Sequence, residues 1–301
     1  MALVPRLISV SCFGTLVQRT RPRGQQIKHA LEKAFPPSTD VPSAAALYQG
    51  YKSAFRKQSA VAPNFGKGTV GSSRIWWRDV MRETVTGAGA FALVSDRGFE
   101  IACDHLYDNL HENWELCPTT EDALSNLRSY CDLHDCRLGV VANMDDRLPH
   151  LLARLGIADK FDFILSSYDC GAEQPDAYIY FNALALSSVP PLSFQAATPP
   201  ALHCGHLAMD DLHGALGAGF AAMLVNTKFS TLSPLQQLIT EWQTAANKAT
   251  RAWHSPHLGL AMGLLANPMA PLQRLCNETA FVQRDSTCAT RQRIAWLEFC
   301  Q

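Results

Sequence analysis

The sequence of 301 residues lacks the features that mark a membrane or secreted protein. Its longest clean apolar run near the end, Leu258 to Ala266, is about half of a membrane-spanning helix. The ten cysteines are scattered singly, without a repeated Cys-x-x-Cys pattern, and no secretory apolar segment opens the chain. We therefore expect no transmembrane segment, and reduced thiols in an intracellular compartment.

An excess of charge of one sign is also missing. The formal net charge of −1 provides no general field to attract nucleic acid or anionic lipid, and there is no specific nucleic-acid signal. Hydrophobic residues make up 47% of the chain and charged residues 18%. This balance is typical of a soluble globular protein that buries a substantial core.

Acidic residues are absent before Glu32. The same stretch carries five basic residues: Arg6, Arg19, Arg21, Arg23 and Lys28. This pattern is typical of a mitochondrial presequence and predicts mitochondrial import. The alternative interpretation is a basic surface loop on a cytoplasmic protein. Since residues 7–11 also have the pattern of a core strand, a targeting signal here would have to stay uncleaved.

Short β-rich runs, most of them followed by a helical pattern, predict a parallel sheet. They are Leu7–Ser11, Arg137–Asn143, Phe161–Ser166 and Ala222–Asn226, with a fifth run, Ala201–Cys204, that ends at a glycine. Parallel strands joined by crossover helices predict a doubly wound α/β core. The functional crevice of such a core lies at the carboxyl ends of its strands.

The long insertion between the first two strands predicts a small helical cap over the strand ends. Helical spacing of apolar residues covers Ala44–Ser59, Ser72–Glu83 and Phe91–Glu112. Two apolar faces are expected, one made of Leu47, Tyr51 and Phe55 and one made of Ile75, Trp76 and Val80.

The domain organisation predicted from these patterns has three parts. Residues 1–19 and 114–228 form the core, residues 20–113 the cap, and residues 229–301 a mostly helical C-terminal extension. In the extension, one helix with Ser233 as its N-cap runs to Ala252, and a last helix spans Thr290–Cys300. We expect the extension either to wrap the core or to dock on a partner.

Several motifs stand at the expected strand ends. The first strand runs into Gly14-Thr15-Leu16, and later strands end near Asn143, Gln174-Pro175-Asp176 and Gly205. In the cap, Pro63–Gly66 is followed by Ser73–Val80, and Phe161–Ser167 comes later in the core. Over about the first 228 residues the chain resembles the haloacid dehalogenase (HAD) superfamily with a helical cap. The resemblance implies a Rossmann-like α/β core.

The resemblance also implies a set of catalytic roles. In the superfamily, an aspartate after the first strand attacks phosphorus, and a second one two residues later acts as acid and base. A hydroxyl after the second strand and a lysine near the third hold the phosphoryl oxygens, while acids near the fourth help to hold Mg²⁺. These positions fall here on Ser11, Phe13, Ala142, Gln174 and His206.

None of these residues can perform its implied role. A serine hydroxyl is un-ionised near neutral pH, and phenylalanine has no proton to give. One acid of the last motif survives, at Asp211 or at Asp210, and a single carboxylate is a poor Mg²⁺ site. Residues that shape the fold are retained at the family positions: Gly14, Thr15, Asn143, Asp176, Gly205 and Asp211.

Three further groups of residues admit a chemical interpretation. Cys12 is expected to point away from the crevice, because side chains alternate along a strand, and so to be no nucleophile. A zinc site in the run His203–His206 with Asp210, Asp211 and His213 is disfavoured, since His203 and Cys204 should face opposite ways. Either aspartate is expected to cap the following helix or to stabilise it through its positive end. Trp76, Trp77 and Trp114 are expected to pack in the core rather than on a ligand.

The sequence therefore predicts a catalytically inactive HAD-like protein that serves as a structural or assembly subunit of a larger, mitochondrial complex. No cofactor is expected, and the partners are protein subunits bound through the extension or the cap. Two alternatives remain open. One is a divergent small-molecule phosphatase whose rebuilt site uses Asp210 or Asp211 with Mg²⁺. The other is a metabolite-binding sensor.

Overall fold

The core of the protein is a six-stranded parallel sheet with strand order β5-β4-β1-β6-β7-β8. The computed structural model describes residues 5–118, 120–189, 201–225 and 252–255. The strands are β1 (Leu7–Val10), β4 (Arg137–Ala142), β5 (Phe163–Ser166), β6 (Ala201–Gly205), β7 (Ala221–Val225) and β8 (Ala252–Ser255). The predicted doubly wound α/β fold is confirmed, and each of the five predicted strands lies within two residues of its expected bounds.

The sixth strand was not predicted. Strand β8 pairs in parallel with β7, with Ala222 opposite Ala252 and Val225 opposite Ser255. Part of the C-terminal extension is therefore an edge strand of the core sheet. The helix predicted with Ser233 as N-cap was expected to run to Ala252, but Ala252 begins strand β8. The rest of that helix and the helix predicted over Thr290–Cys300 lie outside the described residues.

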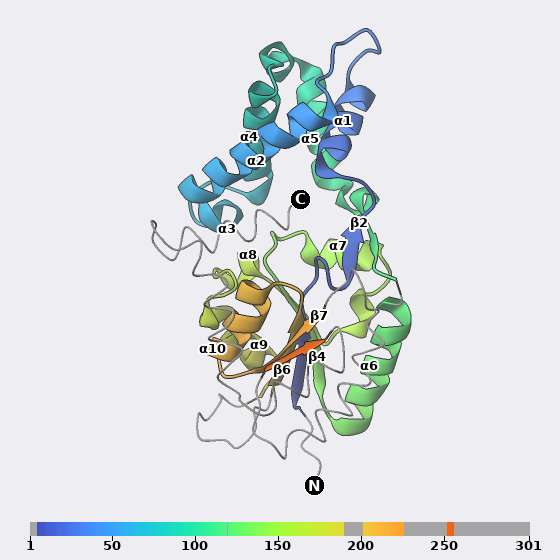
Figure 1. The fold of residues 1–301 in the computed structure, drawn as a ribbon, viewed down its shortest axis with the longest axis vertical. Helices are drawn as coiled ribbons and strands as arrows, with labels where there is room; N and C mark the ends of the chain where they lie inside the picture. Colours follow the sequence, from blue (N-terminus) through green and yellow to red (C-terminus); the bar gives the residue numbers. More distant parts are fainter. Residues whose placement is uncertain (1–4, 119, 190–200, 226–251, 256–301) are drawn as a thin grey trace.

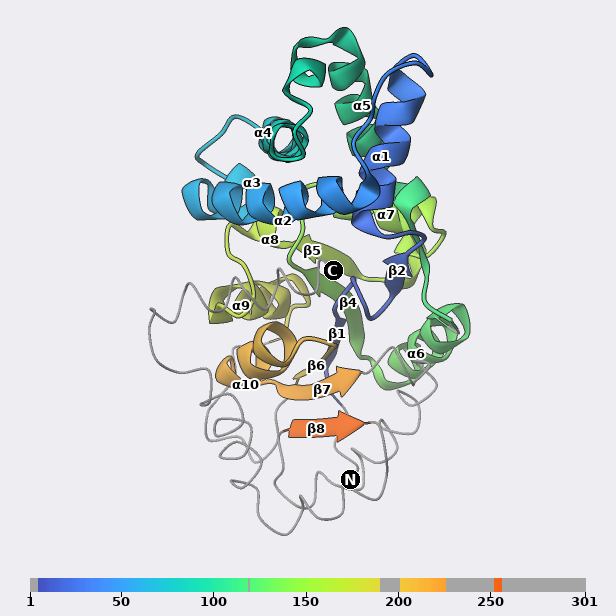
Figure 2. The same ribbon diagram turned by 45° about the horizontal axis from the view of Figure 1, so that its top comes forward.

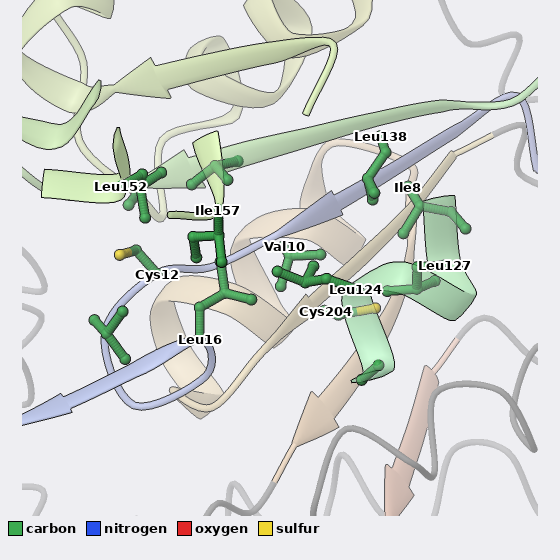
Figure 3. Close-up of a cluster of buried hydrophobic side chains, with 14 of the residues drawn as sticks. Ile8, Val10, Cys12, Leu16, Leu124, Leu127, Leu138, Leu152, Ile157 and Cys204 are labelled. Carbon is green, nitrogen blue, oxygen red and sulfur yellow. The ribbon is translucent and has the colours of Figure 1, made fainter. Parts of the chain in front are cut away.

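Helices cover both faces of the sheet (Figures 1 and 2). One face carries α6 (Thr120–His134) and α7 (Leu148–Arg154), and the other carries α9 (Ala177–Leu186) and α10 (Gly214–Gly217). On the first face, Leu124 and Leu127 of α6 pack with Ile8, Val10 and Leu138 of the central strands (Figure 3). On the other face, Leu7 of β1 and Val141 of β4 are buried as well, as is typical of interior strands of a parallel sheet.

The cap lies over the carboxyl ends of the strands and has a hydrophobic core of its own (Figure 2). Its helices are α1 (Arg23–Ala34), α2 (Ala44–Val61), α3 (Pro63–Gly66), α4 (Ser73–Gly87) and α5 (Arg97–Asp108). The face predicted from Leu47, Tyr51 and Phe55 is buried in this core, as are Trp76 and Val80. The prediction for Ile75 was wrong, because 45% of that residue is exposed.

The helix predicted over Phe91–Glu112 is broken into three pieces. A 3₁₀ turn, η1 (Phe91–Ser95), precedes α5, and a second turn, η2 (Leu110–Asn113), follows it. The first break has a local cause: Asp96 is the N-cap of α5, and its carboxylate accepts the backbone N–H of Gly98 at 2.6 Å.

A two-stranded antiparallel ribbon carries the chain between core and cap. It consists of β2 (Val17–Arg19) and β3 (Trp114–Leu116). The remaining short elements are η3 (Ala158–Lys160), α8 (Ser167–Cys170) and η4 (Ala208–His213), the last a π-helical turn. Within the described ranges, no helix is both long and apolar enough to cross a membrane.

Candidate functional site

A pocket lies between the cap and the carboxyl ends of β1, β4 and β6. Its volume of about 60 Å³ has room for a few water molecules. The core lines it with Ser11, Phe13, Ala142, Asn143, Met144, Asp145, Arg147, Gln174, His206, Leu207, Asp210 and Asp211. The cap and the ribbon contribute Arg19, Arg23, Tyr51, Phe65, Trp77, Leu110 and Trp114. The fold thus brings together the five positions that the resemblance linked to catalysis.

After β1, the chain turns sharply and separates its side chains. Ser11 and Phe13 line the pocket, and the ring of Phe13 packs against Trp114 with 4.4 Å between ring centroids. Cys12 points into the hydrophobic core (Figure 3), where burial and then the nearby Cys117 raise the pKa of its thiol. Gly14 takes φ 67°, the left-handed region that suits glycine. The prediction that Cys12 faces away from the crevice is confirmed.

The loops after β4 and β5 bond to each other across the pocket floor. The Asn143 side-chain amide donates to the Gln174 carbonyl at 2.9 Å, and the Gln174 backbone N–H donates to Asn143 Oδ1 at 2.6 Å. Ala142 offers a methyl group where the family has a hydroxyl. The polar atoms of Asn143 are therefore directed to the neighbouring loop.

The Gln174 side chain also forms hydrogen bonds within the core. Its amide donates to Tyr180 Oη at 2.9 Å and to Asp211 Oδ1 at 3.1 Å. A lysine at this position would carry a positive charge, which a glutamine cannot supply. Asp176, two residues later, is the N-cap of α9 and accepts the backbone N–H of Tyr178 at 2.9 Å, as expected for a capping residue.

Asp211 lies at the centre of a buried hydrogen-bond network. Its Oδ1 is 3.1 Å from His203 Nε2, and its Oδ2 accepts the backbone N–H groups of His206 and Leu207, each at 2.8 Å. Burial opposes ionisation, but the bond to His203 and these further contacts lower the pKa of Asp211. A Cβ at Gly205 would overlap this carboxylate, so the close approach requires glycine.

The expectation that Asp210 or Asp211 caps the following helix was wrong, but Asp211 does lie in the first turn of η4, the place expected for an acid that stabilises the positive end of a helix. Leu207 precedes the π-helical turn η4, and no side chain caps that turn. Asp211 instead bonds back to the loop that enters the turn. Its carboxylate closes that loop onto the end of β6, a contact that residue type and spacing did not reveal.

The residues present do not fit the Mg²⁺ ion of the family. Both oxygens of Asp211 already accept hydrogen bonds, and the lost aspartate is Ser11. Asp210 is buried, and burial, followed by the charges of Asp211 and Glu173, raises its pKa to about 8. Since its carboxyl is protonated near pH 7, it is a poor ligand for a hard cation.

The zinc interpretation finds no support from the arrangement of side chains. His203 contacts Tyr180 on the side of the sheet that α9 covers, whereas Cys204 packs in the core on the side that α6 covers. Among the residues that the structure describes, no three His, Cys, Asp or Glu side chains are arranged to hold a metal ion.

A buried ion pair beside the pocket was not predicted. Arg147 donates to both carboxylate oxygens of Asp145, at 2.9 and 2.6 Å, and both side chains are almost fully buried. Burial opposes the charge on Asp145, but Arg147 and the Trp77 N–H lower its pKa. The opposite charges two residues apart were visible in the sequence, but their burial was not.

This ion pair joins the core to the cap. The Trp77 indole N–H of α4 donates to Asp145 Oδ2 at 2.6 Å. The Arg147 guanidinium donates to the Tyr107 carbonyl at 2.9 Å and stacks on the Tyr107 ring, 3.9 Å from its centroid. We call these four side chains, Asp145, Arg147, Trp77 and Tyr107, the cap–core seam.

Two further contacts extend the connection between cap and core. Ser73 at the start of α4 bonds to Asp146 of the core. Asn64 of α3 donates its side-chain amide to the Ser167 carbonyl at 2.8 Å. Cap and core are thus also joined through α3 and through the start of α4.

The aromatic side chains divide between core and pocket. Trp76 is buried in the cap core, as predicted, and donates to the Ala62 carbonyl at 2.7 Å. Trp114 is also buried in the hydrophobic core, as predicted, and Trp77 packs against the cap core. Both also line the pocket, which was not predicted. The Arg19 guanidinium lies over the Trp114 ring at 5.1 Å, and that of Arg23 lies over Tyr51 at 5.2 Å.

Solved structures with the same fold include two HAD proteins. A 2-haloacid dehalogenase of Pseudomonas syringae aligns with a TM-score of 0.52 and 23% identity, over 79% of this chain and 100% of its own. A HAD hydrolase of Bacillus subtilis, solved with bound magnesium, aligns with a TM-score of 0.54 and 17% identity, over 79% and 99%. At this level of identity the likeness concerns the fold alone.

Sequence comparison extends the likeness to the family. The human haloacid dehalogenase-like hydrolase domain-containing protein 3 is 33% identical over 60% of this chain and 67% of its own. The rhythmically expressed gene 2 protein of Drosophila melanogaster is 30% identical over 60% and 69%. A model of the haloacid dehalogenase-like hydrolase family matches residues 12–192. This chain belongs to the haloacid dehalogenase-like hydrolase family.

Proposed function

We propose that this protein is a catalytically inactive member of its family that serves as a structural or assembly subunit of a larger, mitochondrial complex. The proposal rests on which residues stand at the strand ends and on what their polar atoms bind. Ser11, Phe13, Ala142 and Gln174 cannot attack, protonate or hold a phosphoryl group. The polar atoms of Asn143 and Asp211 bond to the scaffold.

The cap–core seam adds a second argument. The magnesium-bound hydrolase of Bacillus subtilis reveals interdomain movement. In this chain, opening the cap would separate Trp77 from Asp145 and expose a buried ion pair. A cap fixed in this way favours a protein used for its shape over one that admits and releases substrate.

The proposed localisation rests on the basic, acid-free N-terminal segment. Strand β1 starts at Leu7 and pairs with both β4 and β6 at the centre of the sheet. Cleavage beyond Leu7 would remove this strand, so we propose import without removal of residues 7–19. Organelle fractionation followed by mass spectrometry of the N-terminal peptide tests this proposal. A mature N-terminus beyond Leu7, or a protein confined to the cytosol, would contradict it.

The proposed inactivity is tested by phosphate release from a panel of small phosphate monoesters, with and without Mg²⁺. We expect no release above the level of an Asp210→Asn, Asp211→Asn double variant. Metal-dependent release that the double variant lacks would instead establish the rebuilt phosphatase. The structural role is tested by the native mass of the protein in extracts of its own cells. Migration as a monomer would argue against a subunit role.

The pocket itself favours one other function, a metabolite-binding sensor. Arg19 and Arg23 line it from the cap side, beside the rings of Trp114 and Tyr51. Guanidinium groups next to aromatic faces suit a small anion with a planar apolar part. This positive charge comes from the cap side, whereas the family places its lysine on the core side.

Thermal unfolding with phenyl phosphate, in the presence of EDTA, tests this second function. A sensor would be stabilised as the ligand concentration rises, because only the folded state binds it. An Arg19→Gln, Arg23→Gln double variant should lose the stabilisation, whereas the exposed Arg82→Gln control should keep it. An unchanged melting temperature at millimolar phenyl phosphate would contradict the sensor function for this class of anion.

A further inference from the structure

Helix α9 is apolar on the side that faces solvent as well as on the side that faces the sheet. Ile179, Tyr180, Ala183 and Leu184 are buried against the strands. The opposite side exposes Tyr178, Phe181 and Leu186, with 56%, 45% and 54% of each residue accessible. A helix that is hydrophobic all round is normally covered on all sides. We call the exposed side of α9, made of these three residues, the α9 face.

The chain on either side of the α9 face carries negative charge only. No lysine or arginine occurs from residue 161 to residue 225 of the sequence. Asp169, Glu173 and Asp176 lie in α8 and in the loop that leads into α9. A complementary occupant would therefore combine apolar side chains with positive charge.

The C-terminal segment of this chain, residues 256–301, is rich in apolar residues and carries four arginines against three acidic residues. It follows β8, which pairs with β7, and α10 directly precedes β7 on the sheet face that carries α9. Fully extended, 46 residues span about 150 Å, so reach sets no limit. The helix predicted over Thr290–Cys300 contains Arg291, Arg293 and Trp296. Arginine and tryptophan are among the residue types most enriched at the energetic centres of interfaces.

We propose that the α9 face is the docking site of the C-terminal segment, residues 256–301, of the same chain. The predicted helix Thr290–Cys300 covers Tyr178, Phe181 and Leu186. Its arginines lie near the acidic residues at the start of α9. The extension then completes the core, as β8 does at the edge of the sheet, and the cap remains the surface available to other subunits.

Photo-crosslinking in the purified full-length protein identifies the occupant directly. Phe181 is exposed, so replacing it with p-benzoylphenylalanine should leave the fold intact. After irradiation, we expect a crosslinked peptide that joins α9 to residues 256–301 at the mass of a single chain. The same probe at Phe91, which is 70% exposed on the cap, should give no crosslink to that segment.

The charges are tested in the same assay. An Arg291→Glu, Arg293→Glu double variant should lower the yield of the crosslink about fivefold, as expected for the loss of exposed charge pairs. Arg284→Glu, outside the predicted helix, should leave the yield unchanged.

Three results would overturn the inference. They are a crosslink between two chains at the dimer mass, a crosslink to any other segment of the chain, and no crosslink at all. A further experiment separates this inference from the proposed function. In extract of the native cells, a crosslink from Phe181 to a different protein would contradict intramolecular docking while supporting a role as a complex subunit.

Discussion

Asp145 and Asp211 line the same pocket, and each is a buried carboxylate, but their partners differ. Asp145 is held by the full charge of Arg147 and by Trp77 of the cap. Asp211 is held within the core by His203, by the Gln174 amide and by two backbone N–H groups. One carboxylate joins two domains, and the other joins two loops of one domain.

The difference shows where charge is used in this protein. In a phosphatase of the family, the positive charge near the strand ends acts on the substrate. Here Gln174 supplies none, and the buried guanidinium of Arg147 neutralises Asp145 beside the cap. The charge of Arg147 is thus paired within the protein, at the contact between core and cap. The predictions below disturb one carboxylate or the other and compare the results.

The largest effect is expected at the cap–core seam. Arg147→Met leaves Asp145 charged and buried without its ion-pair partner, which should lower the free energy of unfolding by about 3–5 kcal/mol. Urea unfolding measures this change. In the double variant Asp145→Asn, Arg147→Met no charge remains buried, so most of the loss should be recovered. For comparison, Glu83→Gln removes the exposed pair with Lys57 and should cost less than about 1 kcal/mol.

A seam that does not hold the cap would behave differently. The single variants Asp145→Asn and Arg147→Met would each lower the free energy of unfolding. The loss in the double variant would then equal the sum of the two single losses. Equal losses of unfolding free energy in Arg147→Met and Glu83→Gln would also contradict the role of the seam. The buried ion pair would then stabilise the protein no more than an exposed pair does.

The second effect is expected in the Asp211 network. Asp211→Ala deprives the backbone N–H groups of His206 and Leu207 of their buried acceptor, which should lower the free energy of unfolding by about 2–4 kcal/mol. Asp211→Asn keeps one acceptor oxygen and should lose less. The exposed Asp159→Asn is the control. Equal urea midpoints for Asp211→Ala and this control would show that the network contributes no stability.

Hydrogen exchange at the cap sharpens the comparison between the two sites. Arg147→Met should accelerate exchange in α4 and α5, since the seam contacts both helices. Asp211→Ala should leave these helices unchanged, because its partners lie in the core alone.

The sheet, and the place of its strand ends beside the pocket, could be predicted from the sequence. Apolar runs of strand length predicted β1, β4, β5, β6 and β7, because strands buried on both faces need such runs. Strand β8 was not predicted, since its four residues, Ala-Trp-His-Ser, show no alternation of apolar and polar side chains. Its position depends on backbone pairing with β7, which no local pattern encodes.

The cap–core seam could not be predicted for a related reason. Trp77 and Asp145 are 68 positions apart, and only the closed fold brings the indole to the carboxylate. The substitution at Ser11 was visible because the position is fixed by the turn at Gly14. The hydrogen bonds of Asp211 could not be predicted either, since its carboxylate accepts the N–H groups of His206 and Leu207 in the loop before the π-helical turn.

The third prediction concerns pH. In the unfolded chain an aspartate titrates near pH 4, whereas Asp210 in the folded protein titrates near pH 8. Between these values the folded state binds one more proton, so the stability of the protein falls as the pH rises. Asp210→Asn lacks this proton. Relative to the parent protein, it should therefore gain about 2 kcal/mol in urea unfolding between pH 5.5 and pH 7.

The control for this measurement is Asp159→Asn, whose stability should follow that of the parent at every pH. If the curve of Asp210→Asn also ran parallel to the parent curve, Asp210 would be ionised in the folded protein at neutral pH. It would then become available as a cation ligand, and the case for the rebuilt phosphatase would be strengthened.

The smallest effect is expected at Asn64, which joins cap and core outside the seam. Asn64 has φ 50° and ψ 52°, a left-handed conformation that asparagine tolerates better than alanine, and its amide donates to the Ser167 carbonyl. Asn64→Ala should therefore cost about 1–2 kcal/mol in urea unfolding. Asn182→Ala, which removes a surface hydrogen bond within α9, should cost less.

Because Asn64 links cap and core without any charge, its loss should speed hydrogen exchange in α3 yet leave α5 protected. If α5 also exchanged faster, the cap would open as one body, and the seam would share its role with Asn64 instead of dominating it.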